Sequence, residues 1–303
     1  MKKIAIIGGG SVGLLFASYL AEHFNVTVYT RTKQQAKTVG SEGIIRVIGE
    51  SKRKMSVRAG VLSEGMDGED LVIVAVKQYH LENVLSLLKN EIKNDIPVLF
   101  VQNGMGHIHK IEKSAHKHVF LGIVEHGALK TGINEIHHTG AGVTKIACYR
   151  GKSSYMEELF KKPIESFLFM REENWYEMLI NKLIVNACIN PLTALYRVTN
   201  GQLIENPFYY ENLKTVFGET IQALRIIDGA AQWTKVMDIC RRTSLNRSSM
   251  LKDIEEGRET EVEAILGYVL QEAEVSRVAA PSVKFLYKSI KGLQNKGKEQ
   301  SDG

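Results

Sequence analysis

Short apolar runs, separated by helical or turn-rich stretches, dominate the first half of the chain. Some of these runs are apolar at every position, as in residues 71–76 (Leu-Val-Ile-Val-Ala-Val). Strands have this pattern when both faces of a parallel sheet are covered by helices. We therefore expect a doubly wound α/β domain with strands at residues 4–7, 26–30, 71–76, 98–101 and 119–124.

After Gly151 the apolar spacing becomes helical and strand signals are scarce. The longest helical patterns cover residues 174–190, 209–229, 232–243 and 260–275. We expect an α/β domain at residues 1–168 and an all-helical domain at residues 169–295. Residues 296–303, rich in Lys, Gly and acidic side chains, are expected to be a disordered tail.

Composition supports two folded domains and excludes several classes of protein. The chain has 303 residues, of which 44% are hydrophobic and 24% are charged, which is typical of globular proteins. Its net charge of +5 is too small and too dispersed to indicate nucleic acid, although it suits an anionic small molecule. The cysteines are odd in number and far apart (Cys148, Cys188 and Cys240), which argues against a disulfide framework and favours the cytoplasm.

The first apolar segment imitates a signal peptide or a short membrane span. Two lysines precede residues 4–21, which carry no charge. Three consecutive glycines interrupt the segment, however, and each would weaken a continuous helix by about 1 kcal/mol relative to alanine. We therefore interpret the segment as a strand, a glycine turn and a helix, and expect no membrane association.

This glycine turn has the spacing of a dinucleotide-binding motif, Gly-x-Gly-x-x-Gly, between a predicted strand and a predicted helix. Gly8 permits the tight turn, Gly10 lets a pyrophosphate approach the backbone, and Gly13 lets the helix pack closely on the strand. The motif predicts a Rossmann-like domain whose cofactor lies on Gly8, Gly9, Gly10, Ser11, Val12 and Gly13.

Basic residues at the end of the second strand favour NADP(H) over NAD(H). An NAD site usually has an acidic residue there for the ribose 2′-hydroxyl, whereas a basic residue accommodates a 2′-phosphate. No Asp or Glu occurs between Val26 and Gln35, but Arg31 and Lys33 do. Two further polar residues, Lys77 and Asn103, follow predicted strands at the edge where open sheets bind ligands.

One buried helix carries a polar stripe. From residue 182 onward the pattern of the predicted helix 174–190 is almost entirely apolar, yet Lys182, Asn186 and Asn190 recur at every fourth position and share a face. Buried polar groups need partners, which a polar ligand would supply. Burial also lowers the pKa of a lysine, which suits it to protonate a carbonyl oxygen. The alternative is a lysine that reaches the helix end while the amides bond to nearby backbone.

Taken with other short motifs, these features resemble the ketopantoate reductases (2-dehydropantoate 2-reductases). The resemblance extends from the first strand to about residue 265. It rests on residues 8–13, Val76-Lys77, residues 102–106 (Gln-Asn-Gly-Met-Gly), residues 125–128 (Glu-His-Gly-Ala), Asn181-Lys182-Leu183, residues 190–194 (Asn-Pro-Leu-Thr-Ala), Asn200-Gly201 and residues 247–251 (Arg-Ser-Ser-Met-Leu).

The resemblance implies NADPH-dependent reduction of 2-dehydropantoate to (R)-pantoate, a step of pantothenate and coenzyme A synthesis. It implies that Lys182 donates the proton to the ketone oxygen and that the substrate is a small 2-oxo acid. We expect a monomer or homodimer. The implied substrate residues are Asn103, Lys182, Asn186, Asn190, Asn200 and Ser249. Besides the glycine motif, the implied cofactor residues are Arg31, Lys77, Asn103, Ala128 through its backbone, and Glu261.

Other chemistries fit the sequence less well. The histidines at positions 107, 109, 116 and 118 lack the spacing of a metal site, and few carboxylates surround the polar stripe, so we expect no metal. Two alternatives stay open: a related reductase for another 2-oxo acid or imine, and a non-catalytic dinucleotide sensor.

Overall fold

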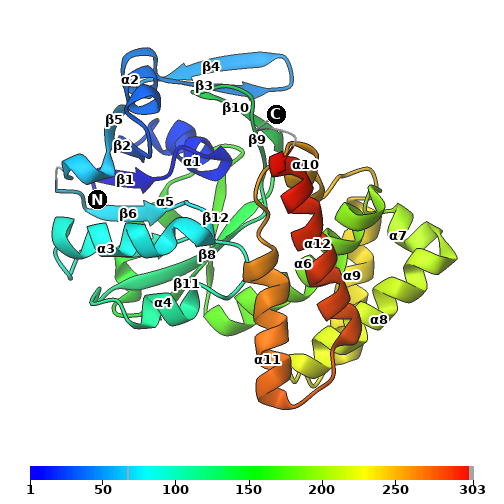
Figure 1. The fold of residues 1–303 in the computed structure, drawn as a ribbon. Helices are drawn as coiled ribbons and strands as arrows, with labels where there is room; N and C mark the ends of the chain where they lie inside the picture. Colours follow the sequence, from blue (N-terminus) through cyan, green and yellow to red (C-terminus); the bar gives the residue numbers. More distant parts are fainter. Residues whose placement is uncertain (67, 300–303) are drawn as a thin grey trace. The chain divides into compact units, whose positions relative to one another are not determined.

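The structure is a computed structural model that describes residues 1–66 and 68–299. Its contacts divide the chain into two compact units (Figure 1). Unit 1 contains Met1–Gln102 and His109–Met178, and unit 2 contains Asn103–Ile108 and the chain from Leu179 onward. The units divide between Met178 and Leu179. The boundary that we expected near residue 168 precedes this division and falls at the start of strand β12 (Leu168–Glu172).

Unit 1 is built around the expected parallel sheet. The strands lie in the order β12-β11-β8-β7-β6-β1-β2-β5, and neighbours from β8 to β5 pair in parallel. All five predicted strands are present, so the predicted α/β class is confirmed. The remaining strand bounds are β1 (Lys3–Ile7), β2 (Asn25–Thr30), β5 (Arg58–Val61), β6 (Leu71–Val74), β7 (Val98–Phe100), β8 (Val119–Val124) and β11 (Val143–Arg150).

Helices complete the layers of this unit. Helix α1 (Ser11–Leu20) is buried from Gly13 onward, because its apolar side chains pack on β1 and β2. The N-terminal segment is apolar because it forms part of the core. The other α-helices described before residue 170 are α2 (Lys33–Glu42), α3 (Leu81–Glu91), α4 (Ile108–Glu112) and α5 (Glu157–Lys161).

A second, four-stranded sheet in unit 1 was not predicted. Its strands lie in the order β4-β3-β10-β9, and α1 contacts three of them. Strand β4 is a Ser-Lys-Arg-Lys-Met edge strand with four exposed residues, so it lacks the apolar signal used above. The bounds are β3 (Ile44–Ile48), β4 (Ser51–Met55), β9 (Gly127–Lys130) and β10 (Glu135–Gly140).

Unit 2 is helical, as predicted. Its longest described helix, α6 (Trp175–Tyr196), begins in unit 1 and is long and apolar enough to cross a membrane, but 72% of its apolar window is buried in the protein. The region expected to be one helix over residues 260–275 starts instead with a π-helical turn, η4 (Glu263–Gly267). The other helices are α7 (Gln202–Glu205), α8 (Pro207–Ala223), α9 (Gly229–Arg242), α10 (Ser249–Glu255), α11 (Tyr268–Ser276) and α12 (Pro281–Glu299).

Helix α12 was not predicted, although it packs against α8, α10 and α11 (Figure 1). The helix continues to Glu299 and so includes the first residues of the segment expected to be disordered. The rest of that expectation concerns residues 300–303, which lie outside the described residues.

Candidate active site

The glycine loop joins β1 to α1 at the carboxyl edge of the parallel sheet. Gly8 has φ +119°, and a Cβ there would lie 3.0 Å from the Ala75 carbonyl oxygen. At Gly13 a Cβ would lie only 1.8 Å from the Gly8 oxygen, so helix and loop touch without room for a side chain. Both positions need glycine for packing, as the motif predicts.

Gly10 faces open space instead. A Cβ built there meets no atom within 4 Å, and Gly10 is the N-cap of α1 without a side-chain capping bond. The first N–H groups of a helix have no partner within the helix, and they favour an anion at that end. The loop therefore fits the pyrophosphate of a dinucleotide, with Ser11 and Val12 in the first helical turn.

Neighbouring strands bring the two predicted basic residues to the same edge. Ile7 is paired with Tyr29 on β2 and with Val74 on β6, so the residues after all three strands are neighbours. Arg31 is exposed there and donates to the His80 ring over 3.5 Å. Lys77 is half-buried after β6. Lys33, by contrast, forms a 2.7 Å ion pair with Glu64.

Strand β9 contributes Ala128 and a lysine that the sequence analysis missed. The Lys130 ammonium donates to the Gly9 carbonyl over 2.9 Å, and the Gln35 amide donates to the same oxygen over 2.8 Å. Ala128 and Lys130 are two residues apart on one strand and therefore share a face. The position of Lys130, two residues after the predicted Ala128 on the same strand, could have pointed to it in the sequence. Gln35 lies in a segment without a motif, so nothing in the sequence pointed to it.

In unit 2, α6 carries the predicted polar stripe. Asn186 and Asn190 are only 8% and 9% exposed on a helix whose neighbouring residues are mostly apolar, and Lys182 is half-buried one turn earlier. Their four-residue spacing places all three on one helix face, in agreement with the predicted geometry. The ammonium and the two amides of this face can donate hydrogen bonds to a small acid, and the ammonium can pair with its negative charge.

Asn103 and Glu261 meet in the same unit. The Asn103 amide donates to the Glu261 carboxylate over 2.9 Å. The neighbouring Gly104 explains how they approach: its φ is +76°, and a Cβ would lie 2.2 Å from the Ala264 oxygen. The Met105 N–H also donates to that oxygen over 3.3 Å. Only glycine allows this backbone contact, which holds residues 103–108 against η4.

Asn200 and Ser249 occupy different environments. The Asn200 amide donates to the Thr243 hydroxyl over 2.8 Å, while its buried Oδ1 has no hydrogen-bond partner among the described residues. Ser249 is exposed at the first residue of α10, and the adjacent Ser248 caps that helix by accepting from the Leu251 N–H over 3.1 Å. Ser248 is therefore structural, and the Ser249 hydroxyl is accessible.

Two side chains outside these groups, His107 and Cys240, lie in the interior. Burial lowers the pKa of His107 to about 4 and raises that of Cys240 to about 11, so both stay neutral near pH 7. Within residues 1–66 and 68–299, no three His, Cys, Asp or Glu side chains are grouped to hold a metal ion.

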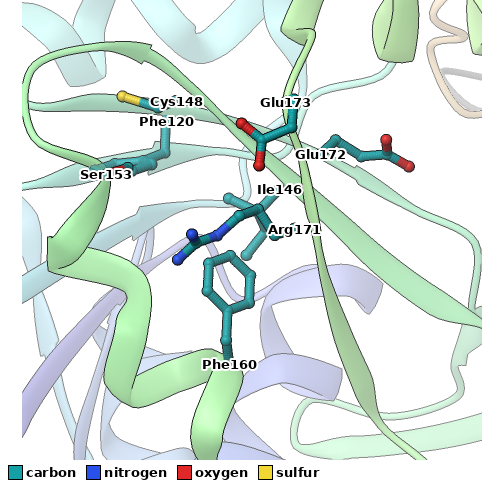
Figure 2. Close-up of a pocket in the computed structure, with 8 residues that line it drawn as sticks. All are labelled: Phe120, Ile146, Cys148, Ser153, Phe160, Arg171, Glu172 and Glu173. Atoms are coloured by element: carbon teal, nitrogen blue, oxygen red, sulfur yellow. The ribbon is translucent and has the colours of Figure 1, made fainter.

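Unit 1 has a small hollow of about 60 Å³, whose lining residues include Phe120, Ile146 and Arg171 (Figure 2). Its walls come from β8, β11, β12 and the α5 region, at the opposite end of the sheet order from β1 and β2. Arg171 lies 5.2 Å from the Phe160 ring centre and pairs with Glu157. None of the predicted site residues lines this hollow.

Comparison with known proteins gives a consistent result over nearly the whole chain. The family described as "Ketopantoate reductase PanE/ApbA" matches residues 4–151, and "Ketopantoate reductase PanE/ApbA C terminal" matches residues 174–294. The 2-dehydropantoate 2-reductase of Bacillus subtilis (strain 168) is 43% identical over 296 residues, covering 96% of this chain and 97% of that protein.

Solved structures agree. The crystal structure of a probable 2-dehydropantoate 2-reductase from Bacillus subtilis has a TM-score of 0.89 at 42% identity, covering 96% of this chain and 99% of that one. A D-mandelate dehydrogenase with NADH and anilino(oxo)acetate also has a TM-score of 0.89, covering 98% of this chain and 99% of that one. Its identity is only 23%, so it shows the fold alone. By sequence and fold, the chain belongs to the ketopantoate reductase PanE/ApbA family.

Proposed function

We propose that this protein is a 2-dehydropantoate 2-reductase that reduces ketopantoate to (R)-pantoate with NADPH. The observation that carries the proposal is the stripe of Lys182, Asn186 and Asn190 along the mostly buried helix α6. A protein that only binds a dinucleotide does not need a cation and two amides along such a helix, because each costs free energy when it leaves water. Membership of a reductase family supports the same conclusion.

A nicotinamide dinucleotide fits the glycine loop, as the open space at Gly10 and the uncapped start of α1 indicate. Arg31 at the end of β2, without an acidic neighbour between Val26 and Gln35, supports NADP(H) as the specific form. Residues 8–13 would hold the pyrophosphate, and Arg31, Lys77 and the Ala128 backbone would hold the adenosine side. When bound, the cofactor supplies the hydride.

The residues of unit 2 would bind the acid and supply the proton. Asn186, Asn190, Asn200 and Ser249 offer amide and hydroxyl groups to its carboxylate and hydroxyl, and Asn103 is held by Glu261. Reduction would place negative charge on the ketone oxygen. The Lys182 ammonium would stabilise that charge and then donate a proton, converting the ketone to an alcohol. Water would return the proton to Lys182 after product release.

The testing experiment follows the loss of NADPH absorbance with purified protein and 2-dehydropantoate. Parallel reactions contain pyruvate, 2-oxoisovalerate, or NADH in place of NADPH. Turnover with 2-dehydropantoate and NADPH well above the other combinations supports the proposal. If NADPH binds but none of the acids is reduced, the substrate assignment is wrong although the dinucleotide site stands.

We further propose that the protein works in the cytoplasm as a monomer or homodimer, without nucleic acid or membrane partners. Its mild net charge of +5 and its three free cysteines support this assignment. Light scattering of the purified protein measures the number of subunits.

A further inference from the structure

Two side chains converge on one backbone oxygen of the glycine loop. Lys130 Nζ, at the end of β9, and Gln35 Nε2, in the first turn of α2, lie 2.9 Å and 2.8 Å from the Gly9 oxygen. Gln35 also donates to the Ile133 oxygen over 2.9 Å, so it ties the loop to the connection between β9 and β10. The second sheet thus supports the loop from one side.

Peptide geometry gives this support a consequence. In a planar trans peptide the C=O of Gly9 and the N–H of Gly10 point in opposite directions. Holding the Gly9 oxygen toward Lys130 and Gln35 therefore turns the Gly10 N–H away from them. The adjoining groups are also held, because Gly8 N–H donates to the Tyr29 oxygen and the Leu14 N–H donates to the Gly10 oxygen, each over 2.9 Å.

The Gln35 side chain lies close to Gly9, in space that a side chain at residue 9 would occupy. A Cβ on Gly9 would lie 2.6–2.7 Å from three atoms of the Gln35 amide. Gln35 is itself held by its helix, since its N–H donates to the Thr32 hydroxyl that caps α2 over 3.3 Å. The middle glycine of the run therefore leaves room for a side chain that orients the loop.

Lys130 also places a positive charge in a half-buried position. Burial lowers the pKa of its ammonium. In the part of the chain that the structure describes, its bonded partner is the neutral Gly9 carbonyl and no carboxylate pairs with it. A half-buried cation without a counter-charge favours an anion nearby, and the adjacent start of α1 favours an anion as well.

We propose that Lys130 and Gln35 are positioning residues for the dinucleotide, which orient the glycine loop by holding the Gly9 carbonyl. The charge of Lys130, on the opposite side of that peptide from the anion, adds to the positive potential of the loop. This inference rests on the proposed use of NADPH. It separates two contributions to cofactor binding: Arg31 recognises the 2′-phosphate, whereas Lys130 and Gln35 act at the pyrophosphate end of the adenosine half.

The experiment compares dissociation constants in the full-length protein for NADPH and for adenosine 2′-monophosphate, which lacks a pyrophosphate. NADPH binding is followed by its fluorescence and nucleotide binding by calorimetry. We expect Lys130→Met to weaken NADPH binding about 10- to 100-fold, the usual effect of losing a charged hydrogen bond. Binding of adenosine 2′-monophosphate should change by less than about threefold.

Three further variants isolate the cause. Lys130→Arg keeps the charge and donors and should recover most of the NADPH affinity. Gln35→Glu keeps the side-chain size but cannot donate to the Gly9 oxygen, so it should weaken NADPH binding and spare the mononucleotide. Lys89→Met removes one exposed charge from α3 and should change neither constant. Thermal unfolding of each variant checks that it is folded.

Unchanged NADPH affinity in both Lys130→Met and Gln35→Glu overturns the inference. An equal loss for both ligands also overturns it, because that result indicates a general disturbance of the unit. A failure of the unmodified protein to bind NADPH rejects the proposed function itself, and the inference falls with it.

Discussion

Asn103 Nδ2 lies 2.9 Å from Glu261 Oε2, although 158 positions separate the two residues in the sequence. Several glutamates surround Glu261 along the chain, and the structure directs three of them elsewhere. Glu255 pairs with Arg247, Glu256 pairs with Arg258, and Glu263 accepts from the Tyr287 hydroxyl over 2.7 Å. Glu261 is thus the glutamate that holds Asn103.

This bond predicts that Asn103 and Glu261 act as one unit in binding the acid. Asn103→Ala and Glu261→Gln should each raise the KM for the keto acid about tenfold, the effect of one hydrogen bond to a charged group. The double variant should be little worse than the poorer single variant. Steady-state kinetics with Glu274→Gln, an exposed change on α11, as control measures this. Fully additive losses would show that the two residues act independently.

Replacing Arg31 should change the preference for NADPH over NADH, whereas replacing Lys33 should not. Arg31→Ala should lower the ratio of kcat/KM for NADPH to that for NADH by about 10- to 100-fold, because a charge-assisted bond to the 2′-phosphate is lost. Lys33→Ala should leave the ratio within about twofold, since Lys33 is paired with Glu64 and its side chain is 85% exposed. An unchanged ratio in Arg31→Ala would remove Arg31 from this role.

The glycines of the loop should separate binding from folding. Gly10→Ala places a methyl group where no protein atom lies within 4 Å, so the melting temperature should fall little while NADPH affinity falls at least tenfold. Gly13→Ala would force a methyl group to 1.8 Å from the Gly8 oxygen and should destabilise unit 1 itself. Thermal unfolding and NADPH titration of both variants measure the difference. Retained affinity in Gly10→Ala would mean that the pyrophosphate lies elsewhere.

The strands and long helices could be predicted because their signal is local. A run such as residues 71–76 indicates burial on both faces, and the four-residue recurrence from Lys182 to Asn190 defines a helix face. Strand β4 carries no such apolar pattern. It is held by pairing with β3 across the turn at Gly49, where φ is +56°. The second sheet was therefore beyond reach of the pattern alone.

Residues of the candidate site could be predicted where they belong to known motifs, but not where their side chains bind backbone groups. The Lys130 ammonium reaches a carbonyl 121 positions earlier in the chain, and every residue has a carbonyl, so the contact leaves no mark in the sequence. Asn103 and Glu261 are 158 positions apart. The predicted strand end pointed to Asn103, whereas only the resemblance to a family pointed to Glu261.

Two buried histidines predict how stability depends on pH. His138 bonds to the Tyr19 hydroxyl over 2.6 Å and to His126 over 3.3 Å, and His126 Nδ1 accepts from the Gly142 N–H over 3.1 Å. Burial, with a smaller effect from His138, lowers the pKa of His126 to about 4 from 6.5; burial also lowers that of His138. A proton on His126 would occupy the lone pair that Gly142 uses.

Because the unfolded chain binds these protons more readily, the free energy of unfolding should fall as pH drops below 6.5 towards 4. The His126 shift corresponds to about 3 kcal/mol at most. Urea unfolding at pH 7.5 and pH 5 measures the loss, which should shrink in His126→Gln and persist in the exposed control His23→Gln. A loss that is unchanged in His126→Gln would contradict the assignment.

The most direct test of the catalytic account is the kcat of Lys182→Ala, measured with saturating NADPH and 2-dehydropantoate, beside its NADPH dissociation constant. The account predicts a fall in kcat of about 10²- to 10⁴-fold with cofactor affinity largely retained. Lys214→Ala, an exposed lysine on α8, should leave both values unchanged. A Lys182→Ala enzyme that retains the kcat of the unmodified protein would contradict the account, since another group would then supply the proton.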